Sequence, residues 1–214
     1  MKDLVFVSVA FGPLYIAQQD RLKESILAIY PDAHLHFHRD KLPMNSRPFL
    51  DSLYGFKVHA IQQAINAGFK KILWLDPAMI LVREIGNIFE NGEVIAVRDE
   101  TALHKVISKS YLNSTGIDRH DLKDWDWHLV GGSLYYFDFS HEKAVTIFNA
   151  WKNDEERGYF GSQQQEASEQ LQGHRADETC MAMNMYQCGV RPVAPDAIGY
   201  CIENNPIFRK LHFK

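Results

Sequence analysis

The run Leu4–Ala10 (LVFVSVA) places the strongest limit on what this chain folds into. It is rich in valine and apolar almost without interruption, and Phe11-Gly12-Pro13 ends it. Such a run is typical of a central strand in a parallel sheet, because both faces of that strand are covered by helices. Lys71–Leu75, which ends at Asp76-Pro77, has the pattern of another strand.

Strand patterns and helix patterns alternate along the first hundred residues. The predicted helices are Ile16–Tyr30, Leu53 to about Ala67 with an Asp51-Ser52 cap, His141–Lys152 and Asp177–Cys188. The further predicted strands are His34–His38, Met79–Val82, Glu93–Val97 and Ser133–Phe139. The polar stretch Thr101–Trp127 fits neither pattern. The alternation predicts an α/β fold with a mostly parallel sheet, and we expect residues 1–214 to form one domain.

Length, charge and cysteine content narrow the class of protein. A chain of 214 residues can bury a sizeable core in one domain. The net charge of −4 argues against a nucleic-acid partner, so an anionic substrate needs a local positive site from Lys, Arg or a metal ion. Three cysteines without Cys-x-x-Cys spacing indicate reduced thiols in a cytoplasmic protein. The sequence predicts neither a signal peptide nor a membrane span.

Asp76 is the most informative candidate residue. It directly follows the apolar strand Lys71–Leu75, and in an open parallel sheet ligands bind at the carboxyl ends of the strands. A carboxylate there suits Mg²⁺ or Mn²⁺, which prefer oxygen ligands and neutralise substrate phosphates. An aspartate that caps a turn with Pro77 is the alternative, and the pattern alone leaves both open.

The segment from Lys70 to Leu81 resembles the hydrophobic strand and Asp-x-Asp motif of GT-A fold glycosyltransferases, the group that contains glycogenin and bacterial lipopolysaccharide galactosyltransferases. This resemblance implies a mixed, mostly parallel central sheet flanked by helices, with a Rossmann-like half that binds nucleotide. It also implies a UDP-sugar donor, with a divalent cation (Mn²⁺ or Mg²⁺) between two acids and the diphosphate. Ala78 stands where the second acid is expected, so Asp76 needs a further metal ligand from elsewhere.

The last residues of the sequence offer that ligand. Leu211-His212-Phe213-Lys214 resembles the late His-Phe segment of the glycogenin-like enzymes, whose histidine completes the metal site. The resemblance therefore implies that Asp76 and His212 hold the metal, and imidazole is an acceptable ligand for Mn²⁺. Simple exposure of a histidine so near a chain end is the alternative.

The exit of the first strand resembles the part of these enzymes that binds the nucleoside. The resemblance implies backbone bonds from Ala10, Phe11 and Gly12 to uracil, and an aromatic stack from Phe11 or Tyr15. Ordinary packing of a strand and a helix start is the alternative for both rings. Lys57 lies on the helix that carries a basic donor-binding residue in related enzymes, which implies a contact with the diphosphate; a solvated lysine is the alternative.

Two later segments complete the resemblance. Gly132 and Ser133 correspond to the family's Asn-Ala-Gly strand, which lines the donor sugar, although Gly-Gly before a strand is also simply a turn. Asp177 and Glu178 correspond to the acids that face the reacting carbon, and Arg175 just upstream would orient them or bind phosphate. The helix dipole alone also favours carboxylates in a first helical turn.

These motifs occur in the family's order over nearly the whole chain. The nearest resemblance is to the amino-terminal glycosyltransferase domain of a chlorella-virus protein that builds capsid glycans, which implies one domain of a longer polypeptide in the host cytoplasm. The implied reaction transfers a hexose or 6-deoxyhexose from a UDP-sugar to a hydroxyl of a glycan or glycoprotein acceptor. With inversion, Asp177 or Glu178 is the general base; with retention, the same carboxylate stabilises an oxocarbenium-like species.

Other interpretations stay open at this point. A non-catalytic nucleotide- or sugar-binding module would explain the loss of the second acid, and a haloacid-dehalogenase-like phosphatase would use Asp76 as its nucleophile. His34, His36 and His38 alternate along a strand, and form either a metal site or one face of an edge strand. Trp125 and Trp127 either stack on an acceptor sugar or fix a loop to the body of the protein.

Overall fold

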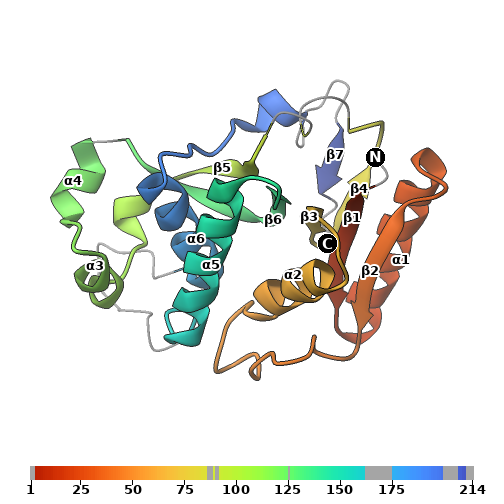
Figure 1. The fold of residues 1–214 in the computed structure, drawn as a ribbon, viewed down its shortest axis with the longest axis horizontal. Helices are drawn as coiled ribbons and strands as arrows, with labels where there is room; N and C mark the ends of the chain where they lie inside the picture. The colour runs from red at the N-terminus through yellow and green to blue at the C-terminus, as the bar shows by residue number, and fades with distance from the viewer. Residues whose placement is uncertain are drawn as a thin grey trace.

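The core of the protein is a five-stranded sheet with the order β2-β1-β3-β6-β5 (Figure 1). The computed structural model describes residues 3–85, 89, 92–124, 126–161, 175–199 and 207–210. The strands of this sheet are β1 (Leu4–Ala10), β2 (His34–Arg39), β3 (Lys71–Leu75), β5 (Val94–Ala102) and β6 (His128–Asp138). β1 pairs in parallel with β2 and β3, whereas β6 is antiparallel to β3 and β5. The prediction of a mixed, mostly parallel sheet is confirmed.

A small second sheet joins two segments that are far apart in the sequence. β4 (Met79–Leu81) follows Asp76 within a few residues, and it pairs antiparallel with β7 (Phe208–Lys210). In this pairing Met79 lies opposite Lys210. The end of the chain's described part is therefore brought beside the end of β3.

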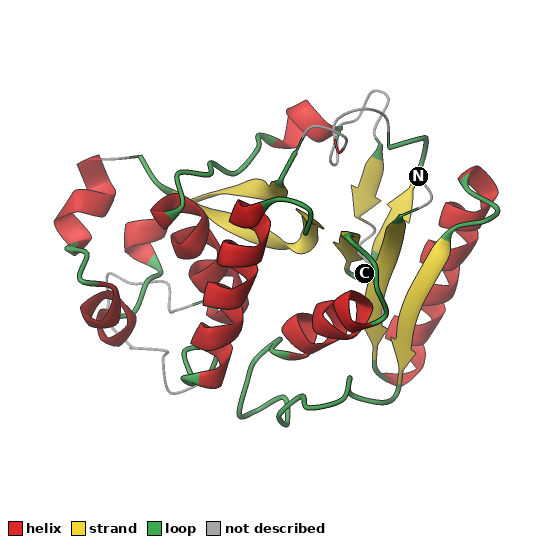
Figure 2. Ribbon diagram, viewed as in Figure 1, coloured by secondary structure: helices red, strands yellow, loops and turns green. Residues whose placement is uncertain are grey.

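Helices cover both faces of the large sheet (Figure 2). The longer ones are α1 (Gly12–Ile29), α2 (Phe56–Asn66), α5 (Glu142–Glu156) and α6 (Ala176–Gln187). The polar stretch that fits no pattern in the sequence contains two short helices, α3 (Lys109–Thr115) and α4 (Arg119–Asp124). Within the described residues, no helix is both long enough and apolar enough to cross a membrane.

Alternation along β1 explains why helices lie on both faces. Successive strand side chains point to opposite sides, so Leu4 and Phe6 pack with Leu22 and Ile26 of α1. Val5, Val7 and Val9 belong to the core on the other side, which α2, α5 and α6 cover. The prediction of a central strand covered on both faces is thus confirmed.

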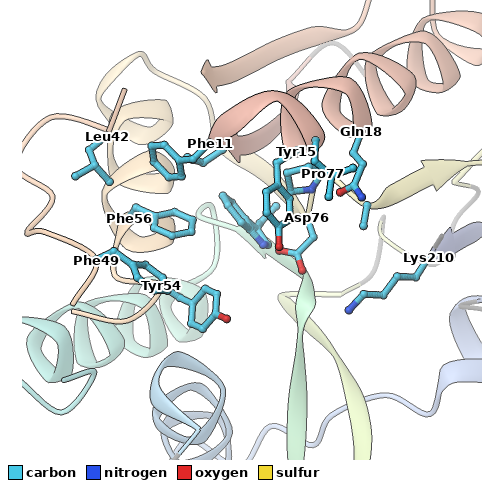
Figure 3. A pocket seen from close by; sticks show the side chains of 14 residues that line it. Phe11, Tyr15, Gln18, Leu42, Phe49, Tyr54, Phe56, Asp76, Pro77 and Lys210 are labelled. Atoms are coloured by element: carbon cyan, nitrogen blue, oxygen red, sulfur yellow. The ribbon is translucent and has the colours of Figure 1, made fainter. Parts of the chain in front are cut away.

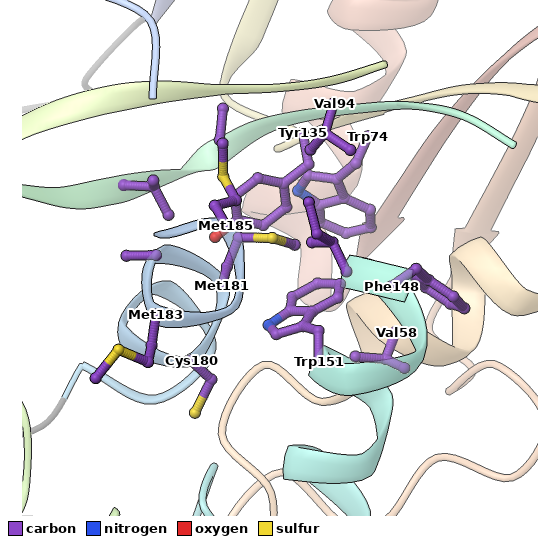
Figure 4. Close-up of a cluster of buried hydrophobic side chains, with 14 of the residues drawn as sticks. Val58, Trp74, Val94, Tyr135, Phe148, Trp151, Cys180, Met181, Met183 and Met185 are labelled. Carbon is purple, nitrogen blue, oxygen red and sulfur yellow. The ribbon is translucent and has the colours of Figure 1, made fainter. Parts of the chain in front are cut away.

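Trp151 lies at the centre of the core formed by α5, α6 and the sheet (Figure 4). Its ring contacts Tyr135 and Phe137 of β6, and its indole Nε1 donates a hydrogen bond of 2.9 Å to the carbonyl oxygen of Asp177. The first turn of α6 is therefore fixed against α5 by both apolar packing and a buried hydrogen bond. This matters for the site, because that turn carries Asp177 and Glu178.

The predicted cap of α2 is wrong. The helix begins at Phe56, after Gly55 and without a side-chain cap, whereas the sequence predicted a start at Leu53 capped by Asp51-Ser52. The Ser52 hydroxyl instead donates a hydrogen bond of 2.6 Å to the Glu155 carboxylate. A tertiary partner has replaced the local cap.

Glu155 anchors the long loop between β2 and α2. Its carboxylate accepts hydrogen bonds from Ser52 and from Arg47 Nε at 3.0 Å, and His59 Nε2 lies 3.4 Å away. Burial favours the neutral acid, but the hydrogen bonds from His59, Ser52 and Arg47 outweigh it and lower the pKa of Glu155 to about 2. The loop that leads into α2 is thus held to α5 by one ionised, buried carboxylate.

We expect Glu155→Gln to lower the free energy of unfolding by about 1 to 3 kcal/mol at neutral pH, because it removes the charge that these donors share. Because folding lowers the pKa of Glu155 from 4.5 to about 2, its stabilising effect is present above pH 4.5 and is lost as the pH falls toward 2. Urea unfolding of wild type and variant across this range should therefore show a difference that shrinks in acid.

Glu156→Gln is the matched control, since the neighbouring Glu156 is 58% exposed and lies 4.0 Å from Lys152. We expect this exposed pair to contribute less than about 1 kcal/mol. Equal effects of the two substitutions would show that Glu155 does not anchor the loop.

Candidate functional site

A pocket of about 840 Å³ opens at the carboxyl ends of β1 and β3 (Figure 3). Asp76 lines it directly after β3, and Phe11 and Tyr15 line it after β1. The remaining lining residues are Val9, Leu14, Gln18, Leu42, Phe49, Tyr54, Phe56, Trp74, Pro77, Ala78 and Lys210. The pocket thus lies where parallel strands end, which is the usual ligand position in an open α/β sheet.

One part of the pocket is aromatic. The Phe11 and Phe56 rings meet edge to face with centroids 5.6 Å apart, and Phe49 and Tyr54 meet in the same way at 5.4 Å. Phe49 and Tyr54 are each more than two-fifths exposed, so their outer faces are open to a ligand. Tyr54 also has a φ of +61°, a left-handed conformation that is costly for a tyrosine and that points to a fixed placement of this ring.

The other part of the pocket is polar. Figure 3 shows Gln18 and Lys210 on one side of Asp76, and Phe49 and Leu42 on the other. Gln18 is 5% exposed, and among the described residues its side-chain oxygen has no hydrogen-bond partner. A buried acceptor without a partner is costly, so this atom favours a ligand that carries a hydrogen-bond donor.

Ser133 connects the two charged residues of the pocket. Its carbonyl oxygen accepts a hydrogen bond of 2.9 Å from the Asp76 backbone N–H. Its hydroxyl accepts a hydrogen bond of 2.8 Å from Lys210 Nζ. Ser133 itself is buried and does not line the pocket, so its predicted contact with the donor sugar stays a prediction.

Lys57 is a buried lysine next to Tyr54 and Trp74, two residues that line the pocket. Lys57 Nζ donates hydrogen bonds to the Gly132 carbonyl oxygen at 2.9 Å and to Asp177 Oδ2 at 2.8 Å. The Tyr54, Trp74 and Tyr135 rings surround the ammonium, with centroids 4.9 to 5.6 Å away. The ammonium is therefore fully engaged inside the protein.

Three carboxylates keep Lys57 charged. Burial alone would lower the pKa of Lys57, but Asp177, Asp76 and Glu178 together raise it above its ordinary value. Burial raises the pKa of Asp177, and the Lys57 ammonium opposes that shift. Because Lys57 stays charged and Tyr135 also donates to Asp177 Oδ2 at 3.2 Å, we treat Lys57 and Asp177 as a buried ion pair.

Glu178 has a different environment from its neighbour. Its side chain is 16% exposed, against 2% for Asp177. Oε1 accepts a hydrogen bond of 2.7 Å from the Gly132 N–H, and Oε2 lies 2.6 Å from Arg175 Nη2. Burial and the Asp177 carboxylate raise the pKa of Glu178 to about 7, although Lys57 and Arg175 oppose this. A carboxylate with such a pKa suits general base chemistry at neutral pH.

The structure brings most of the predicted site residues into one connected region. Phe11, Tyr15 and Asp76 line the pocket. Lys57, Gly132, Arg175, Asp177 and Glu178 form the hydrogen-bonded cluster behind it, and Ser133 adjoins both. His212 lies outside the described residues.

Three predicted donor-binding residues have other partners in the structure. Gly12 N–H donates to Asp40 Oδ1 at 2.7 Å, and the Ala10 carbonyl oxygen accepts from Asp40 N–H at 2.9 Å. The Lys57 ammonium binds Asp177 and does not line the pocket, because burial places it among the three rings. The Gly12 N–H, the Ala10 carbonyl oxygen and the Lys57 ammonium therefore each have a hydrogen-bond partner within the protein.

The described residues do not by themselves fit a divalent cation. Within the described part of the chain, no group of three His, Cys, Asp or Glu side chains is arranged to hold a metal. Ala78 lines the pocket at the position where the family's second acid is expected, and the Lys210 ammonium lines the same pocket. The Asp76–His212 metal site therefore stays a prediction that depends on residues outside the described part.

The remaining candidates that the structure describes, His36, His38 and Trp127 among them, do not line the pocket. His36 and His38 lie side by side on β2 with ring centroids 4.9 Å apart, and burial lowers the pKa of both, so they favour the neutral form. Trp127 is 8% exposed and stacks on Tyr186 at 4.2 Å, so it fixes its loop to α6 and is not open to a sugar. Trp125 lies outside the described residues.

Gly132 is the close-packed point of the cluster. A Cβ at this position would lie 2.7 Å from Lys57 Nζ and 3.0 Å from Glu178 Oε1, whereas a Cβ at Gly131 would meet nothing closer than the Val97 carbonyl oxygen at 3.9 Å. We expect Gly132→Ala to lower the free energy of unfolding by about 1 to 3 kcal/mol through overpacking. Gly131→Ala, the matched control, should change it by less than about 0.5 kcal/mol. Equal unfolding midpoints in denaturant would contradict this packing.

Comparison with known proteins supports the fold. No protein-family model and no curated protein sequence matches the chain. Among solved structures, the chain is similar to a glycosyltransferase involved in the glycosylation of the major capsid of PBCV-1. That similarity covers 99% of this chain and 95% of the other, with a TM-score of 0.50 and 11% sequence identity. At this identity the comparison shows a shared fold, so the protein has a GT-A-like α/β fold.

Proposed function

We propose that the protein is a glycosyltransferase that moves a hexose or 6-deoxyhexose from a UDP-sugar to a hydroxyl of a glycan or glycoprotein. The observation that carries this proposal is Glu178, a partly exposed carboxylate with a pKa near 7 that is bonded to Gly132. The next residue, Ser133, is hydrogen-bonded to both Asp76 and Lys210 of the pocket. The shared fold and the motif order in the sequence support the same conclusion.

The pocket suits a nucleoside. Phe11 and Tyr15 offer rings for stacking on uracil, and the exposed faces of Phe49 and Tyr54 add further apolar surface. The unpartnered oxygen of Gln18 matches a donor on the ligand, which the uracil N–H or a ribose hydroxyl supplies. Aromatic walls with a few placed polar groups are typical of small-molecule sites.

Glu178 is the proposed general base, and Asp177 the residue that fixes its surroundings. Asp177 is buried and paired with Lys57, so it is closed to substrate. Both roles need an ionised carboxylate, but only a general base takes up a proton during the reaction, and a pKa near 7 suits that proton transfer. We therefore propose inversion of configuration, with the acceptor proton passing to Glu178.

The resemblance implies one account of how the diphosphate charge is offset, namely Mn²⁺ bound by Asp76 and His212, and this account stays a prediction. A divalent cation in such a site supplies Lewis-acid stabilisation of the departing diphosphate. Because the described residues alone do not complete that site, the reaction should be measured both with Mn²⁺ and with a chelator.

Glu178→Gln should lower kcat for UDP release by about 100-fold or more, because the amide cannot accept the acceptor's proton. In the wild type, the base works only when ionised, so kcat should rise with pH through about 7 and level off above it. The variant should lose this pH dependence. The assay follows UDP release from a panel of UDP-sugars with a glycan acceptor, and the coupling constant of the anomeric proton reports the configuration.

Glu100→Gln is the matched control, since Glu100 is an exposed glutamate on β5. It should leave kcat and its pH dependence unchanged. Turnover by Glu178→Gln at the wild-type rate would exclude Glu178 as the base. Binding of UDP without any turnover by the wild type would favour a non-catalytic nucleotide-binding module instead.

A further inference from the structure

The pocket poses a charge problem for a nucleoside diphosphate. A diphosphate is strongly anionic, the whole chain carries a net charge of −4, and Asp76 adds a negative side chain to the pocket. Ala78 occupies the place where a second metal-binding acid is expected. A positive group must therefore offset both the diphosphate and Asp76.

Lys210 is placed to do this. Its strand β7 pairs with β4, so that Lys210 lies opposite Met79, the residue after Ala78. Its side chain lines the pocket, and its Nζ donates a hydrogen bond of 2.8 Å to the Ser133 hydroxyl. An ammonium has three N–H donors, and with the described residues the Lys210 ammonium makes one hydrogen bond, which orients the group.

The nearby cations are committed elsewhere. Lys57 is held inside the protein by Asp177, and Arg175 lies between Asp99 and Glu178. Neither residue lines the pocket. Of the described residues that line it, Lys210 is therefore the one that carries a positive charge.

We propose that Lys210 binds the donor's diphosphate and offsets its charge in place of a divalent cation, so that UDP binds to this protein without metal. This inference rests on the proposed function, and Lys210 is not among the residues that the sequence resemblance implies. In the transfer step, the bond between the anomeric carbon and the diphosphate oxygen breaks and its electron pair stays on UDP. The acceptor oxygen forms the new bond to that carbon, and its proton passes to Glu178. Lys210 stabilises the negative charge that develops on the departing UDP.

Substitution of Asp76 distinguishes this proposal from a metal site. If Asp76 holds a metal, Asp76→Asn weakens UDP binding in Mn²⁺. If Lys210 offsets the charge instead, Asp76 is a like charge near the diphosphate, and Asp76→Asn should increase UDP affinity in Mn²⁺ and in EDTA alike. In Mn²⁺ the two accounts thus predict opposite signs for one substitution.

The experiment is calorimetric titration with UDP, in EDTA and in Mn²⁺, on the wild type, Lys210→Ala, Lys210→Arg, Arg209→Ala and Asp76→Asn. In EDTA the wild type should bind UDP, and Lys210→Ala should weaken binding about 10- to 100-fold, the range of a lost charge-assisted hydrogen bond. Lys210→Arg should restore most of the affinity. Arg209→Ala is the matched control, because Arg209 is the adjacent basic residue on β7, is exposed and does not line the pocket.

The other outcomes separate a failure of the proposed role of Lys210 from a failure of the proposed function. Wild-type binding that requires Mn²⁺, or equal affinity of wild type and Lys210→Ala in EDTA, overturns the role of Lys210 while leaving the proposed function intact. Absence of UDP binding under both conditions overturns the proposed function itself. If Lys210→Ala does not fold, Lys210→Gln retains a donor for Ser133 without the charge. The same loss of affinity in that variant supports the proposal, and wild-type affinity contradicts it.

Discussion

The candidate site depends on one buried ammonium. Lys57 lies among three aromatic rings, and its charge is balanced by the Asp177 carboxylate 2.8 Å away. It also binds the Gly132 carbonyl oxygen, so it joins α2, β6 and α6 at a single point. Loss of one partner of a buried ion pair typically costs about 3 to 5 kcal/mol, since the other charge is left uncompensated. Lys57 thus holds both Gly132, which donates to Glu178, and Asp177, which precedes Glu178 in the chain.

Adjacent acids acquire different chemistry from this arrangement. Asp177 and Glu178 are consecutive in the first turn of α6, and consecutive helical residues point about 100° apart. One side chain is therefore directed into the core toward Lys57, and the other toward Gly132 and the half-exposed Arg175. Environment, not residue type, makes the first a structural ion and gives the second a pKa close to 7.

The sequence predicted correctly the strands whose own residues show an unambiguous pattern. β1 and β3 agree with the predicted bounds, because uninterrupted apolar runs that end at Gly-Pro or Asp-Pro leave few alternatives. The predicted start of α2 is wrong, because the Ser52 hydroxyl donates to Glu155, a partner distant in the sequence that no local pattern shows. Most predicted site residues are gathered in one region, but the ion pair of Lys57 with Asp177 and the position of Lys210 opposite Met79 depend on contacts between segments far apart in the chain.

The pairing of β4 with β7 has a consequence for synthesis. One wall of the pocket contains Ala78 from the first half of the chain and Lys210 from near its end. Closing such a long loop carries an entropic cost that is repaid only after both strands are present. A nascent chain that has emerged from the ribosome as far as α6 would have its core helices but an unfinished pocket, so ligand capture has to wait until translation has passed residue 210.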